Sequence, residues 1–73
     1  MDIKKGELVK IKTSRKGEYI AEALKDFNTW KDDWFPVKVA QDKPVYGMTK
    51  VWRKGDEIPC RKSLVKHITK VEK

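Results

Sequence analysis

Short segments in which apolar and charged residues alternate constrain this chain more than any other feature. The clearest is GELVKIKT at residues 6–13, where Val9 and Ile11 alternate with Lys10 and Lys12. A period of two places the two apolar side chains on one face of a strand and the two lysines on the other. The segment therefore predicts a half-buried β-strand whose solvent face is lysine.

The apolar residues are too few to build more than one small core. Hydrophobic residues make up 38% and charged residues 40% of the 73 positions. The whole chain, 1–73, is therefore predicted to form a single small basic domain. A core of this size favours a compact small barrel or a small α+β unit over a fold with a deep cavity, so no small-molecule substrate is expected.

Residues 18–28, EYIAEALKDFN, fit two interpretations. As a helix, the segment places Ile20, Leu24 and Phe27 on one stripe. As a strand, it pairs back on the first strand through the SRKG turn at 14–17. Strand pairing is favoured at the start of the segment, and a short helix at 18–28 is the alternative.

WFPVKVAQ at 34–41 carries the next strand pattern, with its phenylalanine and two valines on one face. Pro36 has no N–H to donate to a neighbouring strand, so this strand is expected to start at an edge or just after Pro36. Trp34 opens an apolar segment and is predicted to be a core residue.

VYGMTKVW at 45–52 alternates over eight residues and predicts one long strand. Gly47 indicates a bend or bulge within it. The alternation places Val51 on the inner face and Trp52, together with Lys50, on the outer face. A bulge at Gly47 would invert these faces, because it shifts the register by one residue.

The remaining segments predict a hairpin and a closing strand. RKGD at 53–56 fits a tight turn, and EIPCRK at 57–62 fits the strand that returns from it, with its isoleucine and cysteine facing inward. A short apolar stretch at 63–65 precedes the last strand pattern, HITKVEK at 67–73.

The predicted order is a strand, an irregular excursion, three strands joined by tight turns, a short helical turn and a final strand. This order resembles the SH3-like small-barrel class over most of the chain. The resemblance implies a mainly β fold, a small SH3-like barrel of about five short strands; a helix at 18–28 would make it a small α+β unit instead. Barrels of this class often serve as adaptor or modulator subunits, so the resemblance also implies a protein-binding role.

The chain is strongly basic, with a net charge of +7 and a pI of about 9.6. The charge is uneven along the sequence: it is +4 over 1–17, −3 over 18–33, +4 over 34–55 and +2 over 56–73. A field of this strength on a small protein favours a polyanionic partner, whereas the acidic segment favours a partner of the opposite sign.

Catalytic and metal chemistry are not expected. Cys60 is the single cysteine, so an intramolecular disulfide is excluded, and an inward-facing strand position suits it. Cys60 and the single histidine, His67, do not supply the ligand set of a structural zinc site, and no sequence neighbour orients His67 as a base. No cofactor is expected, and no apolar run is long enough for a signal peptide or a membrane span, which predicts a cytoplasmic protein with no membrane partner.

Nucleic acid is the predicted partner. Cations that displace counterions from phosphates are interleaved with flat rings that stack on sugars or bases. A non-catalytic nucleic-acid-binding protein with mainly phosphate contacts and low sequence specificity is therefore predicted. The candidate residues are Lys10, Lys12, Lys50, Trp52, Arg53, Lys54, Arg61 and Lys62.

KVWRKGDEI at 50–58 is similar to the strand and turn with which the 7 kDa chromatin proteins of thermophilic archaea meet the DNA minor groove. In that family a tryptophan and an arginine lie against the DNA, and Trp52 and Arg53 stand at the matching positions. The resemblance implies DNA, rather than RNA, as the partner. The apolar wedge residues of the family fall on Lys54 and Glu57, so intercalation between base steps is not implied.

The acidic segment supports an alternative, a protein partner. Acidic and aromatic side chains are interspersed over 18–34, as expected for a patch that docks a protein with a basic surface. The candidate docking residues are Tyr19, Glu22, Asp26, Trp30 and Asp33. In this alternative the chain is an adaptor or modulator subunit.

Overall fold

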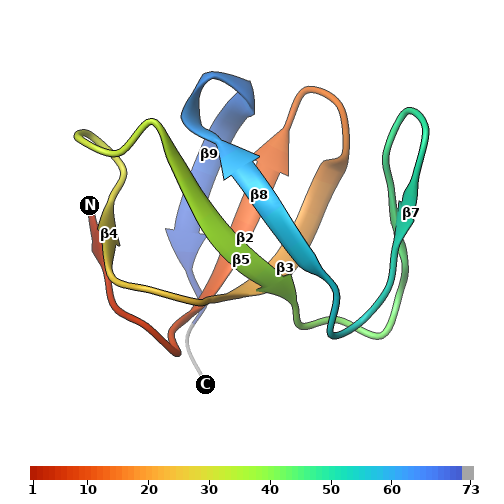
Figure 1. Cartoon of the computed structure of the whole chain (residues 1–73), viewed down its shortest axis with the longest axis horizontal. Coiled ribbons are helices and arrows are strands. Elements are labelled where there is room, and N and C mark those ends of the chain that lie inside the picture. The colour runs from red at the N-terminus through yellow and green to blue at the C-terminus, as the bar shows by residue number, and fades with distance from the viewer. Residues whose placement is uncertain (72–73) are drawn as a thin grey trace.

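The structure, a computed structural model, describes residues 1–71, and these residues form a mainly β fold (Figure 1). The mainly β prediction is confirmed. In chain order the elements are β1 (Asp2–Ile3), β2 (Leu8–Thr13), β3 (Gly17–Ala23), β4 (Phe27–Asn28), β5 (Trp34–Val39), β6 (Val45–Tyr46), β7 (Val51–Trp52), β8 (Glu57–Arg61), the 3-10 turn η1 (Lys62–Leu64) and β9 (Val65–Lys70).

Five of the strands form one antiparallel sheet in the order β8-β5-β3-β2-β9. The sheet curls, so that β5 and β8 lie in front of β2 and β9 in Figure 1. The last strand pairs with the first long one, with Val9 opposite Lys70 and Ile11 opposite Ile68. The result is a small five-stranded barrel-like domain. Two further two-stranded pairs, β1–β4 and β6–β7, lie outside this sheet.

The core lies between the two halves of the curled sheet. Inward-facing residues of every long strand except β9 are buried, and the rings of Phe27 and Phe35 stack with centroids 4.0 Å apart. Because the strands alternate, each buried residue has exposed or half-buried neighbours along the chain. The buried hydrophobic residues are Ile3, Val9, Ile11, Tyr19, Ala21, Ala23, Phe27, Phe35, Val37, Val39, Val45, Ile58 and Cys60.

The start of the ambiguous segment, residues 17–23, is a strand, as favoured, and the helix alternative is wrong. β3 pairs with all six residues of β2, from Leu8 opposite Glu22 to Thr13 opposite Gly17. Gly17 has a φ of 72°, a conformation that glycine adopts without strain, and this allows the four-residue turn. Pairing on both edges, with β2 and β5, outweighs the helix propensity of the sequence.

The prediction of one long strand over 45–52 is wrong. The chain reverses within the segment, and β6 pairs with β7 so that Val45 lies opposite Trp52. The Gly47 N–H donates to the carbonyl of Lys50 across the turn, at 2.8 Å. This reversal changes which residues face the core: Val51 is 42% exposed, whereas Trp52 is half-buried against the core.

The RKGD turn is confirmed, but the hairpin built on it is not. The Asp56 N–H donates to the Arg53 carbonyl at 2.9 Å, and Gly55 has a φ of 93°. The strand after the turn, β8, pairs with β5 and not with β7. Its inward-facing residues, Ile58 and Cys60, are buried, as predicted.

Strand β5 begins at Trp34 rather than just after Pro36, and up to Pro36 it pairs on one side only, with β8, which agrees with the expected start at an edge. Pro36 lies opposite Pro59 of β8, and its carbonyl accepts a hydrogen bond from the Leu24 N–H, just beyond the end of β3. A proline is tolerated here because the β3–β5 pairing ends at this point. Trp34 is 55% exposed and not a core residue, since it alternates with the buried Phe35.

The chain closes as predicted, through η1 and the short strand β9. The N–H of Ser14 donates to the Leu64 carbonyl at 3.1 Å, which fixes η1 beside the first turn. The predicted end of the last strand, residues 72–73, lies outside the described residues. Within the part of the chain that the structure describes, no helix is long and apolar enough to cross a membrane.

Tyr19 and Cys60 form a buried polar pair within the core. The Tyr19 hydroxyl has no hydrogen-bond partner among the described residues. Burial raises the pKa of this hydroxyl, and the neighbouring Cys60 thiol raises it further. Burial also raises the pKa of Cys60, an effect that Tyr19 and then Lys16 oppose without cancelling.

The raised pKa of Cys60 predicts a loss of stability at alkaline pH. Above about pH 8.5 the thiol ionises in the unfolded chain but stays protonated in the folded one, so folding takes up a proton and the free energy of unfolding falls as pH rises. The loss from this group is at most about 1.4 kcal/mol per pH unit. We expect urea melts between pH 7.5 and 9.5 to show a steeper decline for the wild type than for Cys60→Ala. Parallel declines would contradict the shift.

Candidate nucleic-acid interface

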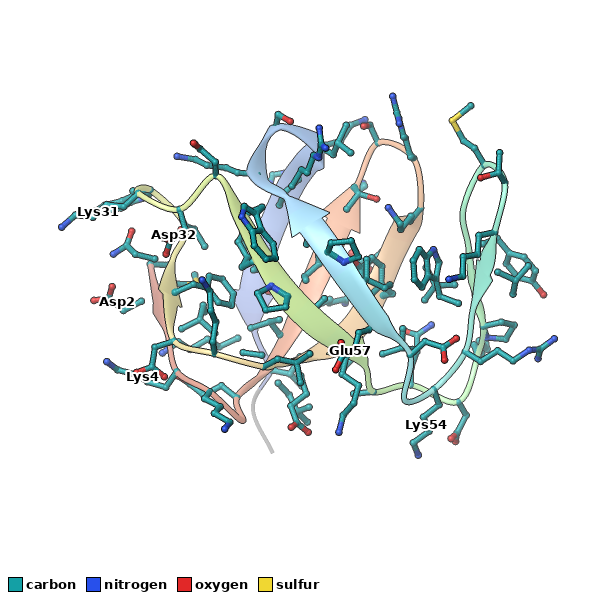
Figure 2. The ribbon with its side chains drawn as sticks, viewed as in Figure 1. Asp2, Lys4, Lys31, Asp32, Lys54 and Glu57 are labelled. Carbon is teal, nitrogen blue, oxygen red and sulfur yellow. The ribbon has the colours of Figure 1, made fainter. Side chains whose placement is uncertain are left out.

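The predicted nucleic-acid-binding residues do not form one surface. Arg53 and Lys54 precede β8, whereas Arg61 is the last residue of β8 and Lys62 follows it. A five-residue strand is about 16 Å long, so β8 separates the two pairs. Figure 2 shows Lys54 at the opposite end of the molecule from the loop that carries Lys31.

The first group, Lys10 and Lys12, lies on the outer face of β2, as the alternation predicts. Both side chains are exposed, while Val9 and Ile11 between them are buried. Lys10 Nζ lies 3.4 Å from a carboxylate oxygen of Glu18 on β3. The charge of this group is therefore partly balanced within the sheet.

The second group surrounds the β6–β7 hairpin. Trp52 is half-buried, and Lys50 Nζ lies 4.1 Å from the centroid of its ring. Lys54 Nζ lies 3.2 Å from Oδ1 of Asp42. The prediction that Trp52 faces outward is wrong, because the hairpin turns it toward the core. Its ring therefore offers little free surface for stacking.

The third group lies at the end of β8, beside β5. Trp34 and Arg61 are cross-strand partners, both pointing outward opposite the buried pair Phe35 and Cys60. Lys25 Nζ lies 5.5 Å from the centroid of the Trp34 ring, near the outer limit of a cation–π contact. An open depression of about 930 Å³ lies here, lined by Asp33, Trp34, Pro59, Arg61, Lys62 and Ser63.

A loop with a second exposed tryptophan joins this group. Trp30 is 79% exposed, and its carbonyl accepts a hydrogen bond from Lys62 Nζ at 2.8 Å. Asn28 fixes the loop, because its side-chain oxygen accepts from the Trp30 N–H at 2.8 Å and its own N–H donates to Asp32 at 2.7 Å. Lys62 therefore lies between the backbone of Trp30 and the depression that contains Trp34.

The residues predicted to dock a protein are dispersed. Tyr19 is 1% exposed and belongs to the core, so it is not available at a surface; its alternation on β3 turns it inward. Glu22 faces outward on β3, and Asp26 accepts a hydrogen bond from the Lys5 N–H at 2.7 Å. Trp30 and Asp33 instead flank the basic residues of the third group.

Ion pairing involves one lysine of the first group and one of the second, while Lys12 and Lys50 of those groups have no acidic partner within residues 1–71. The described residues contain three ion pairs, Lys10 with Glu18, Lys54 with Asp42 and Lys70 with Glu7. Within residues 1–71, Lys25, Arg61 and Lys62 take part in none of them. The third group therefore combines cations without an acidic partner and an exposed tryptophan.

Three members of this group, Lys25, Trp30 and Trp34, are absent from the residues predicted to bind nucleic acid, although Trp30 was among the predicted docking residues. Trp34 could have been found from its alternation with Phe35, Val37 and Val39, which places it on the outer face if those three face inward. Lys25 lies between strands, and no pattern indicates its position over the Trp34 ring.

Comparisons of the chain with protein-family models, curated protein sequences and solved structures find no match. The described residues also contain no cluster of histidine, cysteine, aspartate and glutamate that could hold a metal ion. Function must therefore be inferred from the chemistry of the surfaces themselves.

Proposed function

We propose that this protein binds nucleic acid with low sequence specificity, through the surface formed by Lys25, Trp30, Trp34, Arg61 and Lys62, which we term the Trp34 surface. The observation that carries the proposal is the exposed Trp34 ring, with cations that lack an acidic partner among the described residues on two sides of it. A cation already paired with a carboxylate has less to gain from a phosphate than a free one.

Phosphate contacts supply the affinity in this proposal. Arg61 offers a planar guanidinium that suits two phosphate oxygens, and Lys62 and Lys25 add point charges. The DNA preference implied by Trp52 and Arg53 stays a prediction. The buried thiol of Cys60 fits a reducing compartment, and we place the protein in the cytoplasm on that ground.

A salt titration tests this function. Three phosphate contacts predict a slope of about −2 for the logarithm of the association constant against the logarithm of the salt concentration on a single strand, and about −2.7 on a duplex. Fluorescence anisotropy with labelled 12-residue oligonucleotides of unrelated sequence, at 20 to 200 mM salt, measures the slope. We expect similar affinities among sequences. Absence of binding at 20 mM salt would overturn the function.

Removal of the acidic group from the depression is expected to strengthen binding. Asp33 is exposed and lines the depression beside Arg61 and Lys62, where its carboxylate repels phosphate. Asp33→Asn should raise the affinity for the same oligonucleotides by a few fold at 50 mM salt and less at 200 mM, because salt screens the repulsion. Weaker binding after this change would contradict the repulsion and indicate that Asp33 contacts the oligonucleotide.

Protein docking is the second candidate, and one observation favours it at a different place. The β6–β7 hairpin exposes Tyr46 by 66%, Met48 by 78% and Val51 by 42%. Tyr46 and Val51 are cross-strand partners on one face. A photo-crosslinking residue at Met48 should give a discrete adduct in cell extract that Tyr46→Ser abolishes if this face docks a protein. Unchanged adducts would exclude this candidate.

A further inference from the structure

Trp34 lies where an unpaired base could rest beside two phosphate-binding groups. Its outer face is exposed within an open depression, and Arg61 stands opposite it on the adjacent strand. Cross-strand partners have Cβ atoms about 5 Å apart, so one nucleotide can contact both side chains. Lys62 borders the same depression, and its ammonium has donors left after its bond to the Trp30 carbonyl.

The two partly covered tryptophan rings differ in what they offer. Lys50 Nζ lies 4.1 Å from the Trp52 ring and the ring is half-buried, whereas Lys25 Nζ lies 5.5 Å from a Trp34 ring that is 55% exposed. The weaker contact at Trp34 leaves its ring free to stack. The Lys25 ammonium is then close enough to the ring to pair with a phosphate adjacent to a base stacked on Trp34.

We propose that the Trp34 surface selects single-stranded nucleic acid, with an unpaired base stacked on Trp34 and the adjacent phosphates bound by Arg61, Lys62 and Lys25. This inference rests on the proposed function and specifies its substrate class. In a duplex, the faces of each base are covered by neighbouring base pairs, so no base face is accessible to Trp34. Duplex binding is therefore stabilised by the cations alone. Trp30, whose carbonyl accepts a hydrogen bond from Lys62 Nζ, provides a second exposed ring for a neighbouring base.

The test compares three 12-residue probes at 50 mM salt: oligothymidylate, an abasic oligomer with the same number of phosphates, and a duplex. We expect the wild type to bind oligothymidylate about five-fold to 150-fold more tightly than the abasic oligomer, the range that stacking of one base provides. Trp34→Leu should remove most of the preference for oligothymidylate, with only stacking on Trp30 remaining, and leave the abasic affinity unchanged. Trp34→Phe should retain part of the preference.

Tyr46→Ser is the matched control, because Tyr46 is 66% exposed, compared with 55% for Trp34, but lies on the β6–β7 hairpin. It should leave the affinity for all three probes unchanged. Amide and indole N–H spectra give an independent readout: oligothymidylate should shift the indole signal of Trp34 and leave that of Trp52 in place. Thermal melts confirm that each variant is folded.

The outcomes separate this inference from the function on which it rests. Equal affinities for oligothymidylate and the abasic oligomer, or a duplex bound more tightly than either, would overturn single-strand selection while leaving phosphate binding intact. If Trp34→Leu lowered the affinity for oligothymidylate and for the abasic oligomer equally, Trp34 would only position the cations. That result would also overturn single-strand selection. Failure of all three probes to bind would overturn both.

Discussion

Phe35→Ala is expected to lower the free energy of unfolding by about 3–5 kcal/mol, the usual cost of deleting a buried ring. Phe35 is 1% exposed and its ring stacks on Phe27 at 4.0 Å, so its removal leaves a cavity that β5 and β4 cannot close without moving. A domain of this size has a stability near the low end of 5–15 kcal/mol, so the variant should be largely unfolded in mild urea. Urea melts followed by circular dichroism measure the change.

Val51→Ala is the control for this experiment. Val51 is 42% exposed on the β6–β7 hairpin, so its truncation should cost less than about 0.5 kcal/mol. If Phe35→Ala cost no more than Val51→Ala, the stacked pair would not lie in the core, and the burial that defines the two faces of β5 would be wrong. The outward direction of Trp34 would then lose its basis.

Neutralising Arg61 and Lys62 together is expected to give the largest loss of nucleic-acid binding. Each phosphate contact contributes about 0.7 to the salt slope on a single strand, so Arg61→Gln with Lys62→Gln should reduce the slope by about 1.4. Extrapolated from 1 M salt, this corresponds to an affinity about 25-fold lower at 0.1 M salt. Fluorescence anisotropy at several salt concentrations measures both quantities.

Lys10→Gln with Lys12→Gln is the matched control, since it removes the same total charge. Lys10 is already paired with Glu18, and both lysines lie on β2, separated from β8 in the sheet by β3 and β5. The control should therefore weaken binding only by the few-fold effect of a lower net charge. Equal losses in the two double variants would mean that the whole basic surface, rather than the Trp34 surface, attracts the ligand.

The alternation of apolar and polar residues predicted the long strands, because this pattern depends only on residues that are close together in the sequence. The lysines of β2, the valines of β5 and the inward pair Ile58 and Cys60 all lie on the predicted faces. The segment 45–52 failed for a physical reason. Its alternation is compatible with one strand or with two strands that reverse at Gly47, and the choice depends on whether β8 pairs with β7 or with β5, which is a tertiary contact.

The candidate site was predictable only in part. Arg61 and Lys62 were recognised from their charge, but the aromatic partner was assigned to Trp52 because alternation placed it on the outer face beside Lys50. Cross-strand pairing instead brings Trp34, 27 positions earlier in the chain, opposite Arg61. Such a neighbour cannot be identified before the strand order is known. The same reason explains the error at Tyr19, a predicted docking residue that is buried. Its inward direction depends on the pairing of β3 with β2.

The lengths of the loops that its pairings close determine the order in which the strands of the sheet assemble. The β2–β3 pair is closed by a short turn, whereas the β2–β9 pair joins residues 9 and 70. Closing a loop of about 60 residues costs about 3.6 kcal/mol of chain entropy, so β9 should dock last, after its neighbours have formed a template. Lys62, the first residue of η1, which leads into β9, would then take its final position only in the last step of folding, after the β5–β8 pairing has placed Arg61.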